Sequence, residues 1–218
     1  SVRAVPNGDE YDKDVALAIR YAADNGAKVI NTSFGKYYSP HSDKVREAIA
    51  YAGSKDVLIV NAAGNEGADI DKVNVFPNDT FGTGTEVSDT FLTVGSITSS
   101  YGAKLVSSFS NYGTINVDLF APGSAVYSTT PENEYDTKSG TSMASPSAAG
   151  VAALIRSYYP KLSASEVKHI MMDSGLQVNR EVIVGGDPNN TSSFTKLSRS
   201  GRIVNAYNAL VLAAQRSK

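Results

Sequence analysis

The residue whose type and setting most directly suggest chemistry is Ser142, in the run Gly140-Thr141-Ser142-Met143-Ala144-Ser145-Pro146. A small-residue, apolar stretch over 147–155 predicts a helix after it, with Pro146 in the first turn, where no backbone hydrogen bond is lost. The unpaired N–H groups and partial positive charge of that helix N-terminus would stabilise an oxyanion beside Ser142. This setting is typical of a nucleophilic serine in acyl transfer, although an isolated serine at this place is more often a simple N-cap.

Acyl transfer also needs hydrogen-bond donors that face the developing oxyanion, and Asn65 is the candidate for this role. It lies in Ala62-Ala63-Gly64-Asn65-Glu66-Gly67, shortly after a continuously apolar run at 57–60 that predicts a buried parallel strand. Ligand sites of open α/β sheets gather at the carboxyl ends of such strands. Taken alone, Gly-Asn is also ordinary loop composition, so the order of several matching segments matters more than this pair.

Both segments resemble motifs of the subtilisin-like serine peptidases, namely GTSMASP around Ser142 and AAGNEG around Asn65. The resemblance implies that Ser142 is the nucleophile and that Asn65 binds the oxyanion, assisted by the Ser142 backbone N–H. It extends from Val2 to the C-terminus, with additional residues around 78–90 and 178–198. Four further segments are similar to the family's VINxSxG, FSxxG, DxxAPG and GxINVxxA motifs: residues 29–35, 109–113, 118–123 and 201–206.

In this family the Ser-x-Gly edge binds extended peptide by strand addition, so the resemblance implies a substrate cleft with two walls. The substrate-binding residues would be Ser33, Phe34, Gly35, Ala62, Ala63, Gly64, Glu66, Val75 and Thr141. Val75 stands where glycine often forms the floor of the pocket for the side chain before the scissile bond. A branched floor residue predicts a preference for Leu, Met or Ala, while Glu66 at the mouth would favour Lys or Arg by only about 0–1 kcal/mol.

The other two members of an Asp-His-Ser triad have no match in these 218 residues. In the family, the D-[ST]-G and HGTH motifs precede the VINxSxG strand. His41 and His169 have no HGTH context, and Asp173-Ser174-Gly175 follows the serine and is typical of a helix end. Because the chain begins at Ser1, without a methionine or a signal-like segment, we expect a processed or excised piece of something longer.

Together these observations predict the C-terminal portion of a subtilisin-like catalytic domain that is inactive alone. Its partners would be a polypeptide substrate and either the missing N-terminal part of the same domain or a second copy of itself. The resemblance further implies a secreted or cell-envelope protein. No cofactor is expected for catalysis. Structural calcium is common in the family, mostly through the absent N-terminal part; Asp118 stands where some relatives hold a weaker cation, although a simple loop aspartate explains it better.

Composition argues against several other classes of protein. The 20 basic and 22 acidic residues form no long runs and give a net charge of −2, so no nucleic-acid groove is expected. No apolar stretch approaches the roughly 18 residues that a membrane span requires. The absence of cysteine excludes disulfides, cysteine-ligated metals and a cysteine nucleophile.

The sequence offers three alternatives to a peptidase. A nucleotide-binding loop could begin at Gly82-Thr83-Gly84, but Val87 occupies the third glycine position. An α/β-hydrolase elbow needs G-x-S-x-G, which fails at Ala144. A non-catalytic peptide-binding or structural domain derived from a peptidase stays open, and the sequence upstream of this chain would decide it.

The pattern of elements predicts an α/β fold in one domain, 1–218: a three-layer open sheet of mostly parallel strands with helices on both faces, its N-terminal part absent. The expected strands are 2–5, 29–33, 57–60, 91–94 and 117–121, with a hairpin over 126–139. The expected helices are 12–25, 42–54, one after Ser142, one ending near Ser174 with a Ser163–Glu166 capping box, and 205–216. Residues 64–90 should form a surface loop and 176–200 an irregular segment.

Overall fold

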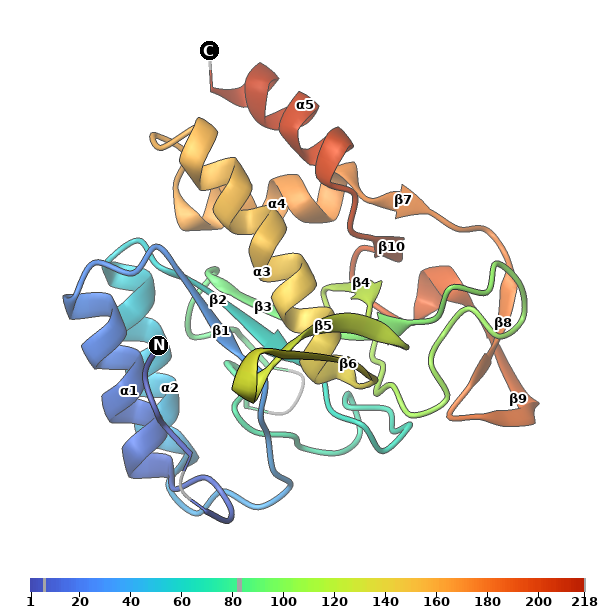
Figure 1. The fold of residues 1–218 in the computed structure, drawn as a ribbon, viewed down its shortest axis with the longest axis horizontal. Helices are drawn as coiled ribbons and strands as arrows, with labels where there is room; N and C mark the ends of the chain where they lie inside the picture. Colours follow the sequence, from blue (N-terminus) through green and yellow to red (C-terminus); the bar gives the residue numbers. More distant parts are fainter. Residues whose placement is uncertain (6, 82–83, 218) are drawn as a thin grey trace.

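A six-stranded sheet in the order β1-β2-β3-β4-β10-β7 forms the centre of the molecule (Figure 1). The computed structural model describes residues 1–5, 7–81 and 84–217, so the Gly82-Thr83 pair considered above lies outside the described residues. The strands β1 to β4 and β10 pair in parallel, and only β7 is antiparallel within this sheet. Their bounds are β1 Val29–Thr32, β2 Leu58–Ala62, β3 Phe91–Ile97, β4 Leu119–Pro122, β7 Leu176–Gln177 and β10 Arg202–Ile203.

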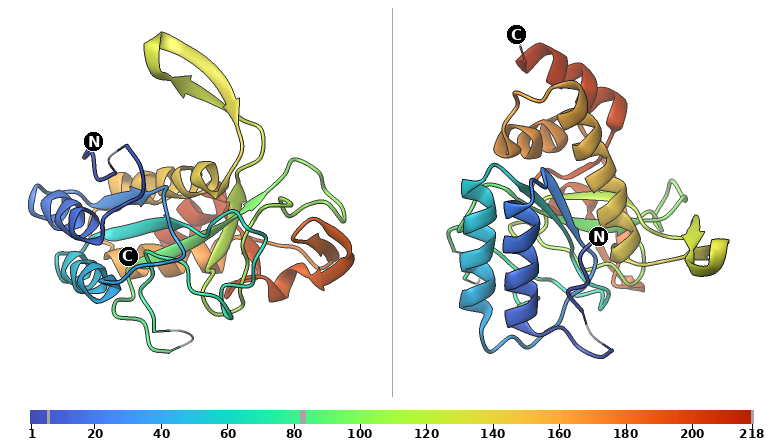
Figure 2. Two further views of the ribbon diagram at one scale, coloured as in Figure 1. Left: turned by 90° about the horizontal axis from the view of Figure 1, so that it is seen from below. Right: turned by 60° about the vertical axis from the view of Figure 1, so that its left-hand side comes forward.

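The central strands are buried on both sides, and alternate side chains enter two different layers. Leu58, Val60 and Leu92 pack against α3 (Thr141–Tyr158), α4 (Ala164–Ser174) and α5 (Ala206–Arg216) on one face. Ile59 and Phe91 pack against α1 (Asp12–Asp24) and α2 (Ser42–Ser54) on the other. Figure 2 shows these two helical layers on either side of the sheet. The expected three-layer α/β architecture is therefore confirmed.

Two local predictions around the serine helix are confirmed in detail. The hairpin β5 (Val126–Thr130) and β6 (Glu134–Lys138), joined by a 3-10 turn at Pro131–Asn133, projects from the body just before α3 (Figure 2). At the start of α4, Ser163 Oγ accepts from Glu166 N at 3.2 Å, and Ser163 N donates to Glu166 Oε2 at 2.7 Å. This is the reciprocal capping box that the sequence predicted.

Three expectations about the remaining segments are wrong. Residues 2–5 form no strand, because β1 pairs only with β2 and this segment instead lines a groove beside α1 and β1. Residues 176–200 are ordered by β7, the hairpin β8 (Glu181–Val184) with β9 (Asp187–Ser193), and a 3-10 turn at Phe194–Lys196. The Gly185-Gly186 pair, with φ of 63° and 73°, was the turn signal that could have revealed this hairpin.

The third wrong expectation is the surface loop over residues 64–90. This segment has no helix or strand in its described part, but several of its side chains are buried. Ile70, Val75 and Asp79 are all buried, and the first two belong to an apolar cluster with Phe120 and Phe194.

No helix within the described residues is long and apolar enough to cross a membrane.

Candidate active site

Ser142 is the second residue of α3 and lies against the residues that follow β1. Its Oγ donates to Ser33 O at 3.1 Å, and Ser33 Oγ donates in return to Ser142 O at 2.9 Å. These two hydrogen bonds join segments 109 residues apart in the chain. The sheet topology thus brings the VINTSFG and GTSMASP segments together, as the resemblance implied.

Pro146 explains why Ser33 reaches the main chain of the serine helix. Because α3 begins at Thr141, Pro146 is its sixth residue and not part of the first turn, which corrects our expectation. A proline there removes the N–H that would bond the carbonyl four residues back, which is Ser142 O. Ser33 Oγ donates to that carbonyl instead. The proline thus leaves Ser142 O available for the hydrogen bond that joins α3 to the residues after β1.

A short network of polar side chains supports this junction. Ser145 Oγ donates to Asn31 Oδ1 at 2.7 Å, and Asn31 Nδ2 donates to Ser33 Oγ at 2.9 Å. Ser145 is fully buried, so its hydroxyl needs such a partner. Sequence reasoning did not single out Asn31 or Ser145, although both lie inside the matching motifs.

Asn65 faces the first turn of α3 with its side-chain amide in a defined orientation. Its Oδ1 accepts from Thr141 N at 2.8 Å and from Thr141 Oγ1 at 3.0 Å. Thr141 is buried, and its hydroxyl also accepts from Gly64 N at 3.1 Å. With Oδ1 held by two donors, Asn65 Nδ2 points away from them, because only this assignment of the amide satisfies both bonds.

Two N–H donors lie near each other at the start of α3, because a Cβ on Gly140 would be 3.6 Å from Ser142 N and 3.7 Å from Asn65 Nδ2. Neither Asn65 Nδ2 nor the Ser142 N–H has an acceptor within the described part of the chain. The Ser142 N–H belongs to the first turn of α3, whose amides have no partner inside the helix. A pair of donors beside a serine hydroxyl at a helix N-terminus can hold an oxyanion.

The predicted walls of the cleft are brought together as well. Residues 33–35 follow β1, and 62–64 end and follow β2, its parallel neighbour. Lys36 N donates to Phe76 O and Phe76 N donates to Lys36 O, each at 2.9 Å. These two bonds attach the segment that carries Val75 to the wall that follows β1.

Val75 lies against both of these walls. A Cβ on Gly35 would lie 3.8 Å from Val75 Cγ1, and Val75 shares an apolar cluster with Ala63. The Phe34 ring packs instead against the cluster of α1 and α2, and the Glu66 side chain is exposed. Val75 thus lies where a residue can contact both walls, whereas the ring of Phe34 belongs to the cluster of the two helices.

Neither histidine contacts Ser142. His41 is the N-cap residue of α2, and its N–H donates to Asp12 Oδ2 at 2.9 Å. His169 lies on α4 with Nε2 2.9 Å from Asp89 Oδ2, and Asp173 pairs with Arg216 at the end of the same helix. Within the described residues, no histidine or carboxylate accepts the proton of Ser142 Oγ, which donates to Ser33 O.

Asp118 does not have the surroundings of a cation ligand. Its Oδ2 accepts from Thr93 N at 2.7 Å, and its Oδ1 lies 3.6 Å from the ammonium of Lys168, a side chain with no exposed area. Burial raises the pKa of Asp118, and the Lys168 charge opposes that rise. The described residues hold no group of three or more His, Asp or Glu side chains that could bind a metal. With an ammonium already opposite Asp118, the residues present do not fit a calcium ion there.

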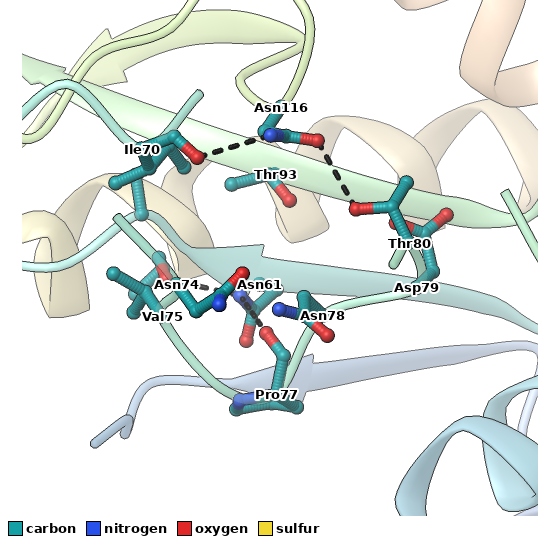
Figure 3. Close-up of a pocket in the computed structure, with 12 residues that line it drawn as sticks. Asn61, Ile70, Asn74, Val75, Pro77, Asn78, Asp79, Thr80, Thr93 and Asn116 are labelled. Carbon is teal, nitrogen blue, oxygen red and sulfur yellow. Dashed lines mark hydrogen bonds between the residues drawn. The ribbon is translucent and has the colours of Figure 1, made fainter. Parts of the chain in front are cut away.

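A polar cavity lies behind the wall formed by Ala62, Ala63 and Val75 (Figure 3). Asn61 Nδ2 donates to Pro77 O at 3.4 Å on one side of it, and Asn116 Nδ2 donates to Ile70 O at 3.0 Å on another. Asp79 also lines this cavity, and its Oδ2 has no hydrogen-bond partner among the described residues. Burial, together with the charge of Glu86, raises the pKa of Asp79 to about 7.

Comparison with known proteins places these features in a family. A family model described as the subtilase family matches residues 1–201. The chain is 36% identical to "Thermophilic serine proteinase" of Bacillus sp. (strain AK1) over 211 residues, which are 96% of this chain and 44% of that protein. It is 39% identical to "Subtilisin DY" of Bacillus licheniformis over 155 residues, 71% of this chain and 52% of that protein.

A solved structure, of a cold adapted subtilisin-like serine proteinase, superposes with a TM-score of 0.65 at 34% identity, over 78% of this chain and 57% of that one. This chain spans about half the length of the curated relatives it matches. The match over almost the whole chain, and the order of the motifs around Ser142, show that the chain belongs to the subtilase family.

Proposed function

We propose that these 218 residues are the C-terminal part of the catalytic domain of a serine endopeptidase. The observation that carries this proposal is that Asn65 Nδ2 and the Ser142 N–H, both without an acceptor in the described part of the chain, lie near one point at the start of α3, the helix that carries Ser142 Oγ. A nucleophile and two donors in this arrangement serve acyl transfer, and family membership supports peptide bonds as the substrate.

In the proposed reaction, Ser142 Oγ attacks the carbonyl carbon of a peptide bond while a base removes the hydroxyl proton. Asn65 Nδ2 and the Ser142 N–H would bind the resulting oxyanion. The base then returns the proton to the departing amine as the carbon–nitrogen bond breaks. Water attacks the acyl-enzyme ester and loses a proton to the same base, which then returns that proton to Ser142 Oγ as the acid leaves.

The base and its orienting aspartate would come from outside these residues, because His41 and His169 both have other partners. The free edge of β1 supports such a partner, since β1 is hydrogen-bonded only to β2 in the described sheet. Beside it lies a groove lined by Val2, Ile19, Ile30 and other residues of α1 and β1. A further strand and helix of the same domain would fit there, and without them the chain is proposed to be inactive.

The substrate preference follows from the filled floor of the cleft. Val75 leaves less room than a glycine would, so medium-sized apolar side chains such as Leu, Met or Ala are proposed before the scissile bond. Glu66 is exposed at the mouth, where a charge pair in water contributes only about 0–1 kcal/mol. Kinship with the subtilisins supports secretion or a cell-envelope location.

A fluorophosphonate probe tests the proposal, because it bonds covalently to an activated serine Oγ and releases fluoride. The longer protein should be labelled at Ser142 and should cleave peptides, and Ser142→Ala should abolish both. The 218-residue chain alone should not be labelled. A longer protein that binds peptides without labelling or cleavage would instead be the non-catalytic peptide-binding domain.

A further inference from the structure

Asn111 is a buried side chain whose four hydrogen bonds all reach the two walls of the candidate site. Its Oδ1 accepts from Glu66 N at 3.0 Å and from Ala68 N at 2.9 Å. Its Nδ2 donates to Ala63 O at 2.8 Å and to Tyr37 Oη at 3.1 Å. The residue has no exposed area. Because the oxygen faces two N–H groups and the nitrogen faces a carbonyl, the orientation of this amide is unambiguous.

These contacts bracket Asn65 in the chain. Ala63 precedes it by two residues and Glu66 follows it directly, so the Asn111 amide ties down the backbone on both sides. The Asn111 main-chain N–H adds a bond to Gly64 O at 3.0 Å. Gly64, with φ of 101°, allows this approach, because a Cβ there would come within 2.3 Å of Asn111 Nδ2.

The bond to Tyr37 joins the opposite wall to the same centre. Tyr37 lies two residues after Gly35, on the segment that follows β1, and its hydroxyl reaches across to Asn111. The Tyr37 hydroxyl oxygen accepts this bond, and burial raises the pKa of the hydroxyl, so the group stays neutral at ordinary pH. A single amide thus sets the position of Asn65 and its distance from the Ser-x-Gly wall.

We propose that Asn111 is a positioning residue for the oxyanion donor, acting through Asn65. This inference rests on the proposed peptidase function, and it assigns a role to a residue of the FSNYG segment that otherwise would be purely structural. An oxyanion donor is effective only when its position is held before the reaction begins. A displacement of about 1 Å in such a group can lower the rate by about 10²-fold.

The test substitutes Asn111→Asp in the longer protein. Asp keeps the shape and the acceptor that holds Glu66 N and Ala68 N, but places a second oxygen against Ala63 O, which repels it. We expect kcat to fall by about 10²-fold with little change in KM, because the repulsion moves Ala63 O, and with it the loop that carries Asn65, away from residue 111. Ser110→Ala is the matched control: Ser110 is equally buried and adjacent in the chain, and its hydroxyl accepts from Ser96 N on β3 and donates to the Asn111 main-chain oxygen, but it makes no bond to the Asn111 side-chain amide.

A double-mutant cycle with Asn65→Ala separates positioning from simple loss of stability. If Asn111 acts through Asn65, adding Asn111→Asp to Asn65→Ala should lower kcat by less than about threefold. Ser110→Ala should lower the melting temperature while retaining most of kcat. Equal kcat losses for Asn111→Asp with and without Asn65 would overturn the inference, as would a kcat loss in Ser110→Ala as large as that in Asn111→Asp.

Tyr37→Phe is a second test that serves if Asn111→Asp does not fold. It removes only the hydrogen bond from Asn111 Nδ2 to Tyr37 Oη, at a half-exposed side chain. It should lower kcat by a smaller factor and show the same dependence on Asn65. No dependence on Asn65 would refute the role. A longer protein with no peptidase activity in its unmodified form would refute the proposed function instead, so the two failures are distinguishable.

Discussion

The substitution Asp79→Asn should stabilise the protein at high pH and have little effect at low pH. Asp79 is 8% exposed, lines the cavity behind Val75, and has an Oδ2 without a partner among the described residues. Burial and the charges of Glu86 and Asp118 disfavour its ionised form, while Lys168 favours it, with the net result that its pKa is about 7. Asparagine keeps the shape of the side chain but has no charge to bury.

The magnitude follows from the difference between the two pKa values. An unfolded aspartate ionises near 3.8, and the folded one near 7, so the folded state binds more protons between these values. The free energy of unfolding therefore falls as pH rises through that window and levels off above about 7. With 1.36 kcal/mol per unit, the full loss is about 4 kcal/mol as an upper bound, and Asp79→Asn should recover it.

Urea unfolding of both proteins at intervals from pH 4 to pH 9 measures this directly. The difference in the free energy of unfolding should be small at pH 4 and grow to a plateau above pH 7. Glu86→Gln should move the wild-type transition to lower pH, because the Glu86 charge contributes to the raised pKa. A difference between Asp79→Asn and wild type that stays constant over this range would refute the reasoning.

Four further outcomes are expected. Asn65→Ala should lower kcat about 10²–10³-fold, a magnitude measured for the corresponding donor in subtilisin itself, and unchanged kcat in steady-state assays would exclude the oxyanion role. Val75→Gly should shift selection on a peptide library toward Phe and Tyr by about 1–3 kcal/mol per methylene of added space; an unaltered profile would show that Val75 is not the floor. Lys168→Met should cost about 3–5 kcal/mol in urea unfolding, because it leaves Asp118 buried and unpaired, and a second change, Asp118→Asn, should restore most of it. The isolated 218 residues should be marginally stable or self-associate, because β1 has a free edge; sedimentation of a stable monomer would contradict this.

Local sequence was sufficient to predict most of the elements and to single out the candidate site residues. The apolar periodicity of α1 and α2, the continuous apolar run of β2 and the Ser163–Glu166 capping box all depend on neighbours within one or two turns. Ser142 and Asn65 were found because their segments match a known pattern, and the structure places them together. Residues 2–5 failed as a strand because strand formation needs a partner that the local pattern does not contain.

Only the tertiary structure decided how these residues are held. Ser33 compensates the helix bond that Pro146 removes, 109 residues away from Ser142, and Asn111 holds the loop of Asn65 from 48 residues beyond Ala63. Burial of Asp79 and Lys168 is likewise invisible in a sequence where both look like surface residues. The physical reason is common to all of them: periodicity and propensity act between near neighbours, whereas a buried polar group finds its partner only where the sheet brings distant segments into contact.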